Sequence, residues 1–181
     1  MRIISGSARG RKLKEPCGNS IRPTSNKVKE AIFSIVQFDI EGRKVLDLFA
    51  GCGQIGIEAL SRGAASVVFV ESSQDAVKLI RENVKTCGFS DSSTIYARDA
   101  IRSLENDDKF DLIFIDPPYD TTLIEKSLQK ITEFDKLNIN GIIMCESKGD
   151  MKLPELSLPY RMVKEYKYGN VKITKITREE H

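Results

Sequence analysis

A chain of 181 residues, 40% of them hydrophobic, is long enough for one well-buried domain and too short for a second of ordinary size. It contains no apolar run that could cross a membrane and no apolar segment typical of a secretory signal, so we expect a soluble cytoplasmic protein. The single histidine is His181 and the four cysteines are widely spaced, which argues against histidine-dependent nucleophilic catalysis and against a metal site.

The net charge of +2 is unevenly distributed. Residues 1–30 contain eight lysines and arginines against two glutamates, a net charge of +6, which leaves −4 for the rest of the chain. Such a basic segment attracts polyanions, although a solvated surface hairpin would give the same pattern.

The first elements along the chain are a hairpin and a helix. Residues 2–14 alternate weakly around two turn-forming stretches, which predicts a short hairpin. A helix follows Pro23, with Thr24 or Ser25 as its N-cap. Its apolar face contains Val28, Ala31, Ile32, Ile35 and Val36. We predict that residues 1–40 form a basic extension of a main domain that comprises residues 41–181.

From Lys44 onward, strands alternate with helices. Strands are predicted at 44–49, 67–71, 94–98, 110–116 and 141–146, and helices at 53–63 and 73–88. Residues 160–177 give two alternating strands around Gly169, typical of an antiparallel hairpin. The sequence therefore predicts an α/β fold, a Rossmann-like, doubly wound, seven-stranded and mostly parallel sheet that ends in an antiparallel C-terminal hairpin.

The first predicted strand runs through Asp47 into a glycine-rich loop. Gly51, Gly53 and Gly56 form the pattern G-x-G-x-x-G before a helix, so a ligand can approach the backbone and the free N–H groups of the helix. Glu71 closes the next strand, beyond the helix that follows the loop, where a carboxylate can bind both ribose hydroxyls. The two features predict a nucleoside cofactor, although Glu71 could also be an ordinary strand end.

A nicotinamide dinucleotide would require the same two features, so the choice of cofactor depends on other residues. The negative charge of Asp47 repels a pyrophosphate but suits the ammonium group of a methionine moiety. The chain has no room for a separate substrate domain and no internal histidine to donate a proton in hydride transfer. These observations favour S-adenosyl-L-methionine.

The segments VLDLFAGCGQIGIEALSRGA, VFVESS, ARDA and FIDPPY, in that order, resemble the class I S-adenosylmethionine-dependent methyltransferases. RIISGSARGRKL followed by IRPTSNKVKEAIFSIV is similar to the N-terminal signature of the bacterial RsmD-type 16S ribosomal RNA (guanine-N2)-methyltransferases. The resemblance spans nearly the whole chain.

The resemblance implies a cofactor site in which Asp47 and the glycine loop hold the methionine end, Glu71 the ribose, and Asp99 and the Ala100 N–H the adenine. Asp99 could instead only cap the helix that follows it. Cys52 and Gln54 stand where the family often has Ser or Thr and Ala. The implied cofactor-binding residues are Asp47, Ala50, Gly51, Cys52, Gly53, Gly56, Glu71, Ser72, Asp99 and Ala100.

The fourth predicted main-domain strand ends in Asp116-Pro117-Pro118-Tyr119. Ligands of a parallel sheet bind beyond the carboxyl ends of its strands, so this turn should face the cofactor's methyl group. Asp116 and the Pro117 carbonyl can accept hydrogen bonds from a target amino group, and Asp116 can accept its proton. Tyr119 offers a ring on which an extruded base can stack. We predict these three as catalytic residues, the alternative being an ordinary proline turn.

The same turn occurs in DNA adenine-N6 methyltransferases, which usually insert a recognition region between the glycine loop and the turn. Here the interval from Gly51 to Asp116 is already filled by predicted strands and helices, which leaves no space for one. Recognition should then depend on the N-terminal extension, which we predict to bind RNA. Its predicted contacts are Arg9, Arg11, Lys12, Lys14, Arg22 and Thr24.

The resemblance thus implies methyl transfer from S-adenosylmethionine to the N2 of a guanine in 16S ribosomal RNA. We expect the substrate to be an assembling small ribosomal subunit and the enzyme to act as a monomer, without a metal or a membrane. Two alternatives remain: an adenine-N6 methyltransferase acting on DNA or RNA, and an RNA-binding assembly factor that has lost catalysis.

Overall fold

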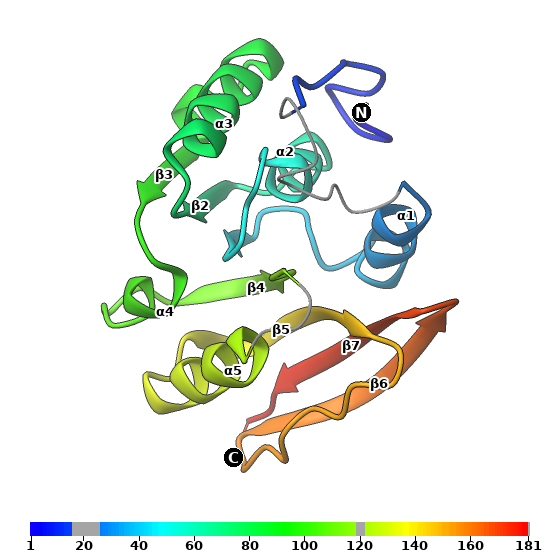
Figure 1. Ribbon diagram of the computed structural model, residues 1–181, viewed down its shortest axis with the longest axis vertical. Helices are drawn as coiled ribbons and strands as arrows, with labels where there is room; N and C mark the ends of the chain where they lie inside the picture. Colours follow the sequence, from blue (N-terminus) through cyan, green and yellow to red (C-terminus); the bar gives the residue numbers. More distant parts are fainter. Residues whose placement is uncertain (16–25, 119–121, 181) are drawn as a thin grey trace.

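The computed structural model describes residues 1–15, 26–118 and 122–180 (Figure 1). The helices are α1 (Asn26–Ile35), α2 (Gln54–Ser61), α3 (Gln74–Cys87), the 3-10 helix η1 (Ser90–Ser92), α4 (Ala100–Ser103) and α5 (Leu123–Glu133). The strands are β1 (Lys44–Asp47), β2 (Ser66–Glu71), β3 (Ser93–Ala97), β4 (Phe110–Ile115), β5 (Leu137–Lys148), β6 (Tyr160–Tyr168) and β7 (Val171–Arg178).

The strands form a seven-stranded sheet in the order β3-β2-β1-β4-β5-β7-β6. Strands β1 to β5 are parallel, β7 runs antiparallel to β5, and β6 runs antiparallel to β7. The predicted fold is therefore confirmed. The chain winds outward from β1 to β3 on one side and from β4 to β5 on the other, where β6 forms the edge and β7 lies between β5 and β6, so the order reverses between β1 and β4. In such sheets, the ligand crevice opens at the carboxyl ends of the two strands at the reversal.

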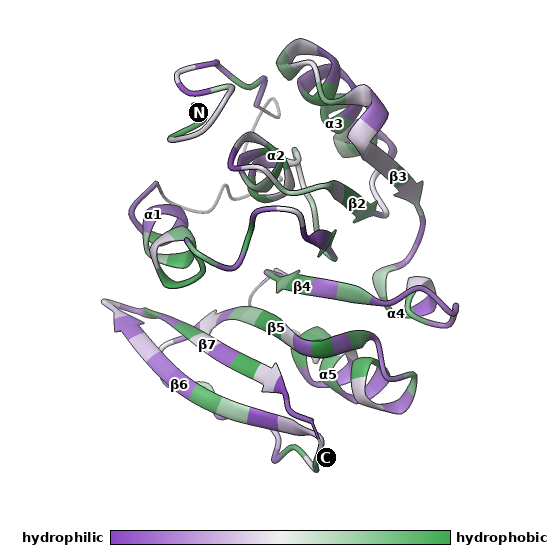
Figure 2. Cartoon of the chain, turned by 180° about the vertical axis from the view of Figure 1, so that it is seen from behind, coloured by the Kyte–Doolittle hydropathy of each residue, from purple (hydrophilic) through white to green (hydrophobic). Residues whose placement is uncertain are grey.

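Helices cover both faces of the sheet. One hydrophobic cluster joins α1, α2, α3 and the N-terminal hairpin to one face, and a second cluster joins α4 and α5 to the other. Helices α1, α3 and α5 combine polar and apolar residues (Figure 2), as expected of helices that bury one side. No helix in the described parts of the chain is long and apolar enough to cross a bilayer.

Helix α3 shows how the local sequence sets an element's bounds. Val77, Ile80 and Val84 recur at helical spacing and are buried against the sheet. Ser73 caps the first turn by accepting a hydrogen bond from the Ala76 N–H, and Gly88 ends the helix with a φ of 79°. The predicted N-cap of α1, Thr24 or Ser25, lies outside the described residues.

The N-terminal hairpin is built into the core. Arg2 and Lys12 form an antiparallel bridge, and the Ile3 N–H donates to the Arg11 carbonyl at 3.0 Å. Ile3, Ala8 and Leu13 are buried in the same cluster as α1 and the inner strands. The basic extension and the main domain thus share one hydrophobic core.

Candidate functional site

The glycine loop joins β1 to α2, and each of its three glycines has a physical reason. Gly51 and Gly53 adopt left-handed backbone conformations, with φ of 56° and 83°. A Cβ on Gly56 would lie 2.3 Å from the ring of Phe69, so only glycine lets α2 pack this closely on β2. Because Gly53 is the N-cap and has no side chain, the first turn of α2 is capped from elsewhere.

Asp47, the last residue of β1, caps that turn. Its Oδ2 accepts a hydrogen bond of 2.9 Å from the Gly56 N–H, and its side chain is 3% exposed. Burial raises the pKa of Asp47 to about 7, and the negative charges of Asp116 and Glu71 add to this rise. Asp47 therefore gains or loses its proton near neutral pH.

Glu71, the last residue of β2, binds the glycine loop with its carboxylate. Its Oε2 accepts a hydrogen bond of 2.9 Å from the Gly51 N–H, and its Oε1 accepts one of 2.8 Å from the Ser73 N–H. The side chain is half-buried, and a carboxylate oxygen can accept a second hydrogen bond. Glu71 thus fixes the loop and keeps acceptor capacity for a ligand hydroxyl, while its neighbour Ser72 is exposed.

Asn83 of α3 connects the glycine loop to the N-terminal hairpin. Its side chain is 1% exposed and donates to the carbonyl oxygens of Cys52 and Lys14, each at 3.0 Å. Its Oδ1 accepts a hydrogen bond of 2.7 Å from the Lys14 N–H. Cys52 is itself buried, which raises the pKa of its thiol.

Asp116 follows β4 directly and is half-buried, while Pro117 is buried. Burial raises the pKa of both Asp47 and Cys145, and the negative charge of Asp116 adds to each rise. Strand register agrees, because Asp47 pairs with Phe114 and Cys145 with Ile115, directly before Asp116. Tyr119, Arg22 and Thr24, which the sequence also predicts for the site, lie outside the described residues.

Asp99 lies two residues beyond the end of β3, and its Oδ1 accepts a hydrogen bond of 2.9 Å from the Arg102 N–H. It therefore caps α4, and its second oxygen can accept a further hydrogen bond. Ala100, the first residue of α4, is buried. Ala50 pairs with the end of β2 through a 3.0 Å hydrogen bond to the Val70 carbonyl.

Four acids thus end or follow four adjacent parallel strands: Asp99 after β3, Glu71 at the end of β2, Asp47 at the end of β1 and Asp116 after β4. All lie at the carboxyl edge of the sheet, around the reversal of strand order. This arrangement concentrates negative charge where the glycine loop exposes backbone to a ligand. It suits a ligand that is cationic and has several hydroxyl or amino donors.

The hairpin that contains the basic residues lies beside α2 and α3 (Figure 1). Arg9, Arg11, Lys12 and Lys14 are all exposed. Arg11 donates to the Thr86 carbonyl and Lys14 pairs with Glu82 at 2.8 Å, so two of the four make contacts within the chain. The hairpin is anchored below them by Glu58, which is fully buried and accepts hydrogen bonds from the Ile4 and Ser5 N–H groups.

Sequence reasoning missed Asn83 and Glu58, both of which position the site. The available signal was a polar residue on an otherwise apolar helix face, because Asn83 lies between Ile80 and Cys87 on the buried side of α3. Such a signal shows that a partner must exist but not which residue it is.

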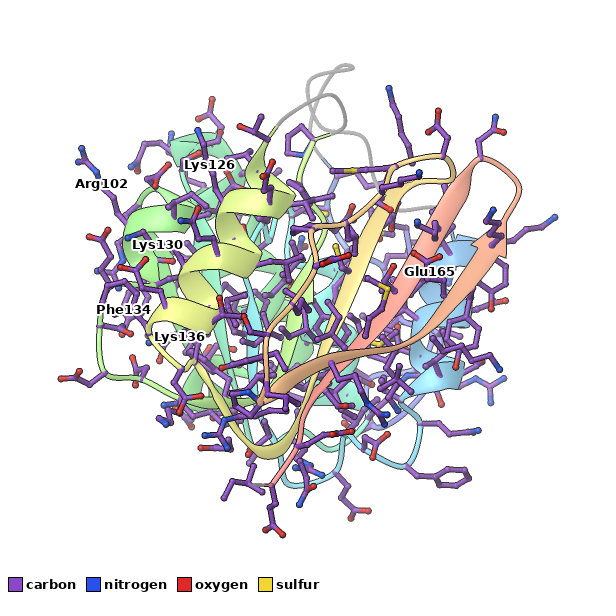
Figure 3. The ribbon with its side chains drawn as sticks, turned by 90° about the horizontal axis from the view of Figure 1, so that it is seen from below. Arg102, Lys126, Lys130, Phe134, Lys136 and Glu165 are labelled. Atoms are coloured by element: carbon purple, nitrogen blue, oxygen red, sulfur yellow. The ribbon has the colours of Figure 1, made fainter. Side chains whose placement is uncertain are left out.

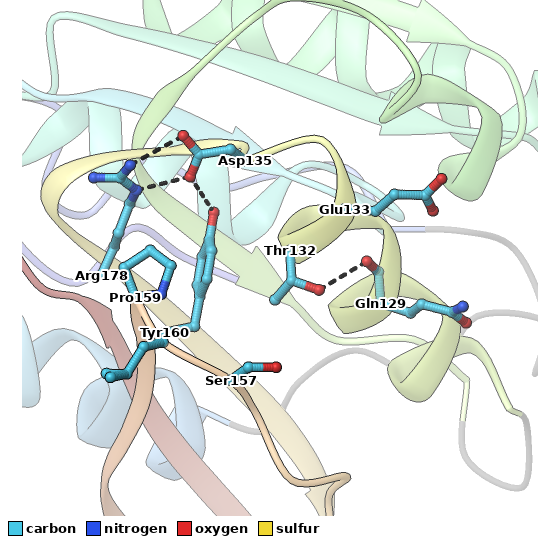
Figure 4. Close-up of a pocket in the computed structure, with 9 residues that line it drawn as sticks. Gln129, Thr132, Glu133, Asp135, Ser157, Pro159, Tyr160 and Arg178 are labelled. Atoms are coloured by element: carbon cyan, nitrogen blue, oxygen red, sulfur yellow. Dashed lines mark hydrogen bonds and ion pairs between the residues drawn. The ribbon is translucent and has the colours of Figure 1, made fainter. Parts of the chain in front are cut away.

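A separate pocket of about 550 Å³ lies at the opposite, amino end of the sheet (Figure 4). Asp135 connects the residues that line this pocket. It accepts two hydrogen bonds from Arg178, at 2.7 and 3.0 Å, and one of 3.0 Å from the Tyr160 hydroxyl. Lys109 adds an ion pair. These contacts hold the pKa of Asp135 well below its usual range, and the hydrogen bonds from Arg178 have the largest effect. Because its charges compensate one another, we assign this pocket no catalytic role.

The comparisons with known proteins agree with the geometry. The model of the family described as Conserved hypothetical protein 95 matches residues 1–177. The chain is 39% identical to "Putative rRNA methyltransferase YlbH" of Bacillus subtilis, over 93% of this chain and 94% of the relative. It is 34% identical to the ribosomal RNA small subunit methyltransferase D of Haemophilus influenzae, over 84% of this chain and 81% of the relative. Among solved structures, "Putative methyltransferase yhhF" from Escherichia coli superimposes with a TM-score of 0.90 at 28% identity, covering 99% of this chain and 98% of that one.

Proposed function

This chain belongs to the family described as Conserved hypothetical protein 95, and on that basis we propose that it methylates the N2 amino group of a guanine in 16S ribosomal RNA, with S-adenosyl-L-methionine as the methyl donor. The family resemblance inferred from the sequence is confirmed. The chain is a ribosomal RNA methyltransferase related to those that act on the small ribosomal subunit. The observation that carries the proposal is the row of acids around the glycine loop at the carboxyl edge of the sheet.

The residues present fit S-adenosylmethionine. Asp47 and Glu71 bring negative charge to a loop in which Gly51 and Gly53 lack side chains, so an amino acid with an ammonium group can approach the backbone. Glu71 would bind the ribose, and Asp99 with the Ala100 N–H would bind the adenine. Bound there, the cofactor supplies a methyl group on a cationic sulfur.

Asp116 and Pro117 act on the target amino group. A guanine amino nitrogen is a weak nucleophile, because its lone pair is delocalised into the ring, so its orientation matters most. The Asp116 carboxylate and the Pro117 carbonyl would accept its two N–H hydrogens, and Asp116 would take up the released proton. Tyr119, which follows in the sequence, would provide a stacking surface for the base.

The N-terminal hairpin would bind RNA phosphates with Arg9 and Lys12, whose side chains are exposed. Arg11 and Lys14 would have to exchange their contacts with α3 for phosphates, and Arg22 and Thr24 are proposed from the sequence alone. We further propose a cytoplasmic monomer that acts, without a metal, on an assembling small subunit. An acidic surface at the crevice is compatible with a large RNA substrate that the enzyme holds by the segments on either side of the reacting base.

The test is to incubate the protein with methyl-labelled S-adenosylmethionine and small ribosomal subunits from a strain that lacks its gene. We expect label in N2-methylguanine after digestion to nucleosides. Label in N6-methyladenine would support the adenine alternative. RNA binding without any label would support the inactive assembly factor, and a full N2-methylguanine complement in the deletion strain would refute the assigned substrate.

A further inference from the structure

The charge of the C-terminal region is as unusual as that of the N-terminal one. Residues 148–178 contain eight lysines and arginines against three acids, a net charge of +5, whereas residues 31–147 carry −7. An acidic middle is thus flanked in sequence by two basic segments. Polyanion binding accounts for the first segment in the proposed function, and nothing yet accounts for the second.

The second segment contains the β6–β7 hairpin, which forms one edge of the sheet. Lys148, at the end of β5, pairs with Val171, just after the hairpin turn. The turn therefore lies at the same carboxyl edge as Asp116, two to three strands from β4, or about 10 to 14 Å at the usual strand spacing. In Figure 1 the N-terminal hairpin and the β6–β7 hairpin lie on opposite sides of the molecule, with the ends of β1 and β4 between them.

Several cations of this region are already compensated. Lys172 pairs with Glu165 at 2.6 Å, Lys175 with Asp39 at 3.5 Å, and Arg178 with Asp135. Lys130 of α5, outside this region, is compensated as well, because it pairs with Glu105 and Glu133. Figure 3 shows Glu165 on the side of the molecule away from Lys130. Within the described residues, Lys152, Lys164 and Lys167 are exposed and make no ion pair.

Aromatic rings accompany Lys164 and Lys167 along β6. Strand pairing places Lys164, Tyr166 and Tyr168 on one face of β6, opposite Lys175, Ile173 and Val171 of β7. The Lys164 Nζ lies 5.0 Å from the centre of the Tyr166 ring, and Tyr168 is 41% exposed. Lys167 lies on the other face of the strand. Lysines interleaved with exposed rings combine phosphate attraction with surfaces on which bases stack.

We propose that the edge strand β6, through Lys164 and Tyr168 on one face and Lys167 on the other, forms a second RNA-binding surface, which contacts the substrate RNA on the far side of the reacting site from the N-terminal hairpin. The inference rests on the proposed function and names a further contact with the same substrate. Its physical reason is electrostatic. The row of acids at the crevice repels phosphates, so an RNA that presents a base there is held most strongly when cations flank the acids on both sides.

The experiment compares two double variants for binding to a 16S ribosomal RNA transcript over a range of salt concentrations. K164A/K167A removes two cations of the proposed surface. R161A/K109A, the matched control, removes two exposed cations at the amino end of the sheet. K164R/K167R keeps both charges. Cofactor binding and melting temperature show that each variant is folded.

We expect K164A/K167A to weaken binding about tenfold or more at low salt and to reduce the slope of log K against log salt by about 1.5, since each phosphate contact contributes about 0.7 to 0.9. Wild-type affinity and slope should persist in the control and in K164R/K167R. Tyr168→Ala should weaken binding severalfold without changing the slope, and Tyr168→Phe should restore it.

Equal slopes for K164A/K167A and its control, with a wild-type protein that binds RNA, would overturn this surface and leave the proposed function intact. A wild-type protein that binds neither the transcript nor small subunits would overturn both. K164A/K167A could instead bind subunits more weakly while its binding to the transcript is unchanged. That result would overturn the proposed RNA contact and would mean that this surface binds a ribosomal protein.

Discussion

The two ends of the sheet treat carboxylates in opposite ways. At the amino end, Asp135 accepts hydrogen bonds from Arg178 and Tyr160, and its pKa lies well below the usual range. At the carboxyl end, Asp47 is buried with a pKa of about 7, and the charges that act on it, Asp116 and Glu71, are negative. The first acid is stabilised as an anion, whereas the second is held where its charge is unfavourable.

This difference separates structure from function. A carboxylate matched by the chain's own cations stabilises the fold and has little left to offer a ligand. A buried carboxylate whose neighbours are also acids costs folding free energy, and a cationic ligand can recover that cost. The pocket at the amino end is lined by charges that compensate one another, so a cavity alone does not identify the functional site.

The strongest way to break the comparison is to remove an acid from each end. Asp116→Ala should lower the rate of methyl transfer about a thousandfold or more, because the amino group loses its orienting acceptor and its base. Cofactor affinity, measured by calorimetry, should change less than about threefold. Asp135→Ala, the control, should keep its turnover rate within about twofold. Equal loss of cofactor binding and turnover in Asp116→Ala would instead assign that residue a structural role.

A second substitution tests the unfavourable charge itself. Asp47→Asn keeps an acceptor for the Gly56 N–H but removes the negative charge, so cofactor affinity should fall about ten- to a hundredfold. The pKa of Asp47 is about 7 in the folded chain against 3.8 unfolded, so the folded chain binds more protons between these values and its stability falls as pH rises through that window.

At pH 8 the same variant should therefore melt at a higher temperature than the wild type, with a gain in the free energy of unfolding of a few kcal/mol at most. At pH 4 the two melting temperatures should be similar. Differential scanning calorimetry of the ligand-free proteins measures both. A lower melting temperature at pH 8 would mean that the Asp47 carboxylate stabilises the fold and would remove the contrast with Asp135.

Asn83 sharpens the comparison from the polar side. Asn83→Ala leaves the carbonyls of Cys52 and Lys14 and the Lys14 N–H without their buried partner, which should cost about 2 kcal/mol of stability. Because Asn83 joins the hairpin to the glycine loop, both the cofactor and the RNA should bind about three- to tenfold more weakly. Asn83→Asp restores the acceptor for the Lys14 N–H alone. Loss of stability with both affinities unchanged would reduce Asn83 to packing.

The smallest effect is expected from the compensated acid. Asp135→Asn should lower the melting temperature at pH 7 by a few degrees, since its ion pairs are partly exposed and screened. Its folded pKa is depressed, so the stabilisation is present above the unfolded value of 3.8 and is lost as pH falls below it. The difference in melting temperature between variant and wild type should then shrink below pH 3. A difference that stays constant with pH would show that it arises from packing rather than from charge.

The main features of fold and site could be predicted because they depend on local pattern. Strands that alternate with helices along the chain predict a parallel sheet, and the carboxyl ends of parallel strands lie at one edge of the sheet. Four acids that are far apart in the sequence therefore lie at the same edge: Asp47, Glu71, Asp99 and Asp116. Helix α4, a single turn, is predicted only as the helix that Asp99 would cap, and α5 is not among the predicted elements.

What could not be predicted depends on partners far apart in the chain. Glu58 and Asn83 bind backbone groups of the N-terminal hairpin, which is distant from both in sequence, so nothing in their own surroundings identifies the contact. For the same reason, the sequence predicts a basic hairpin in the N-terminal extension but not its anchoring on α2 and α3, which depends on these distant partners.

The central claim, that buried Asp47 supplies negative charge for a cationic cofactor at the carboxyl edge, is tested most directly by counting protons. Calorimetric titration of the protein with S-adenosylmethionine at pH 7, in buffers of different ionisation enthalpy, measures the protons released on binding. With a pKa of about 7, Asp47 is partly protonated before binding, so we expect net proton release by the wild type and none by Asp47→Asn. Binding without proton release by the wild type, or equal release by both proteins, would contradict the account.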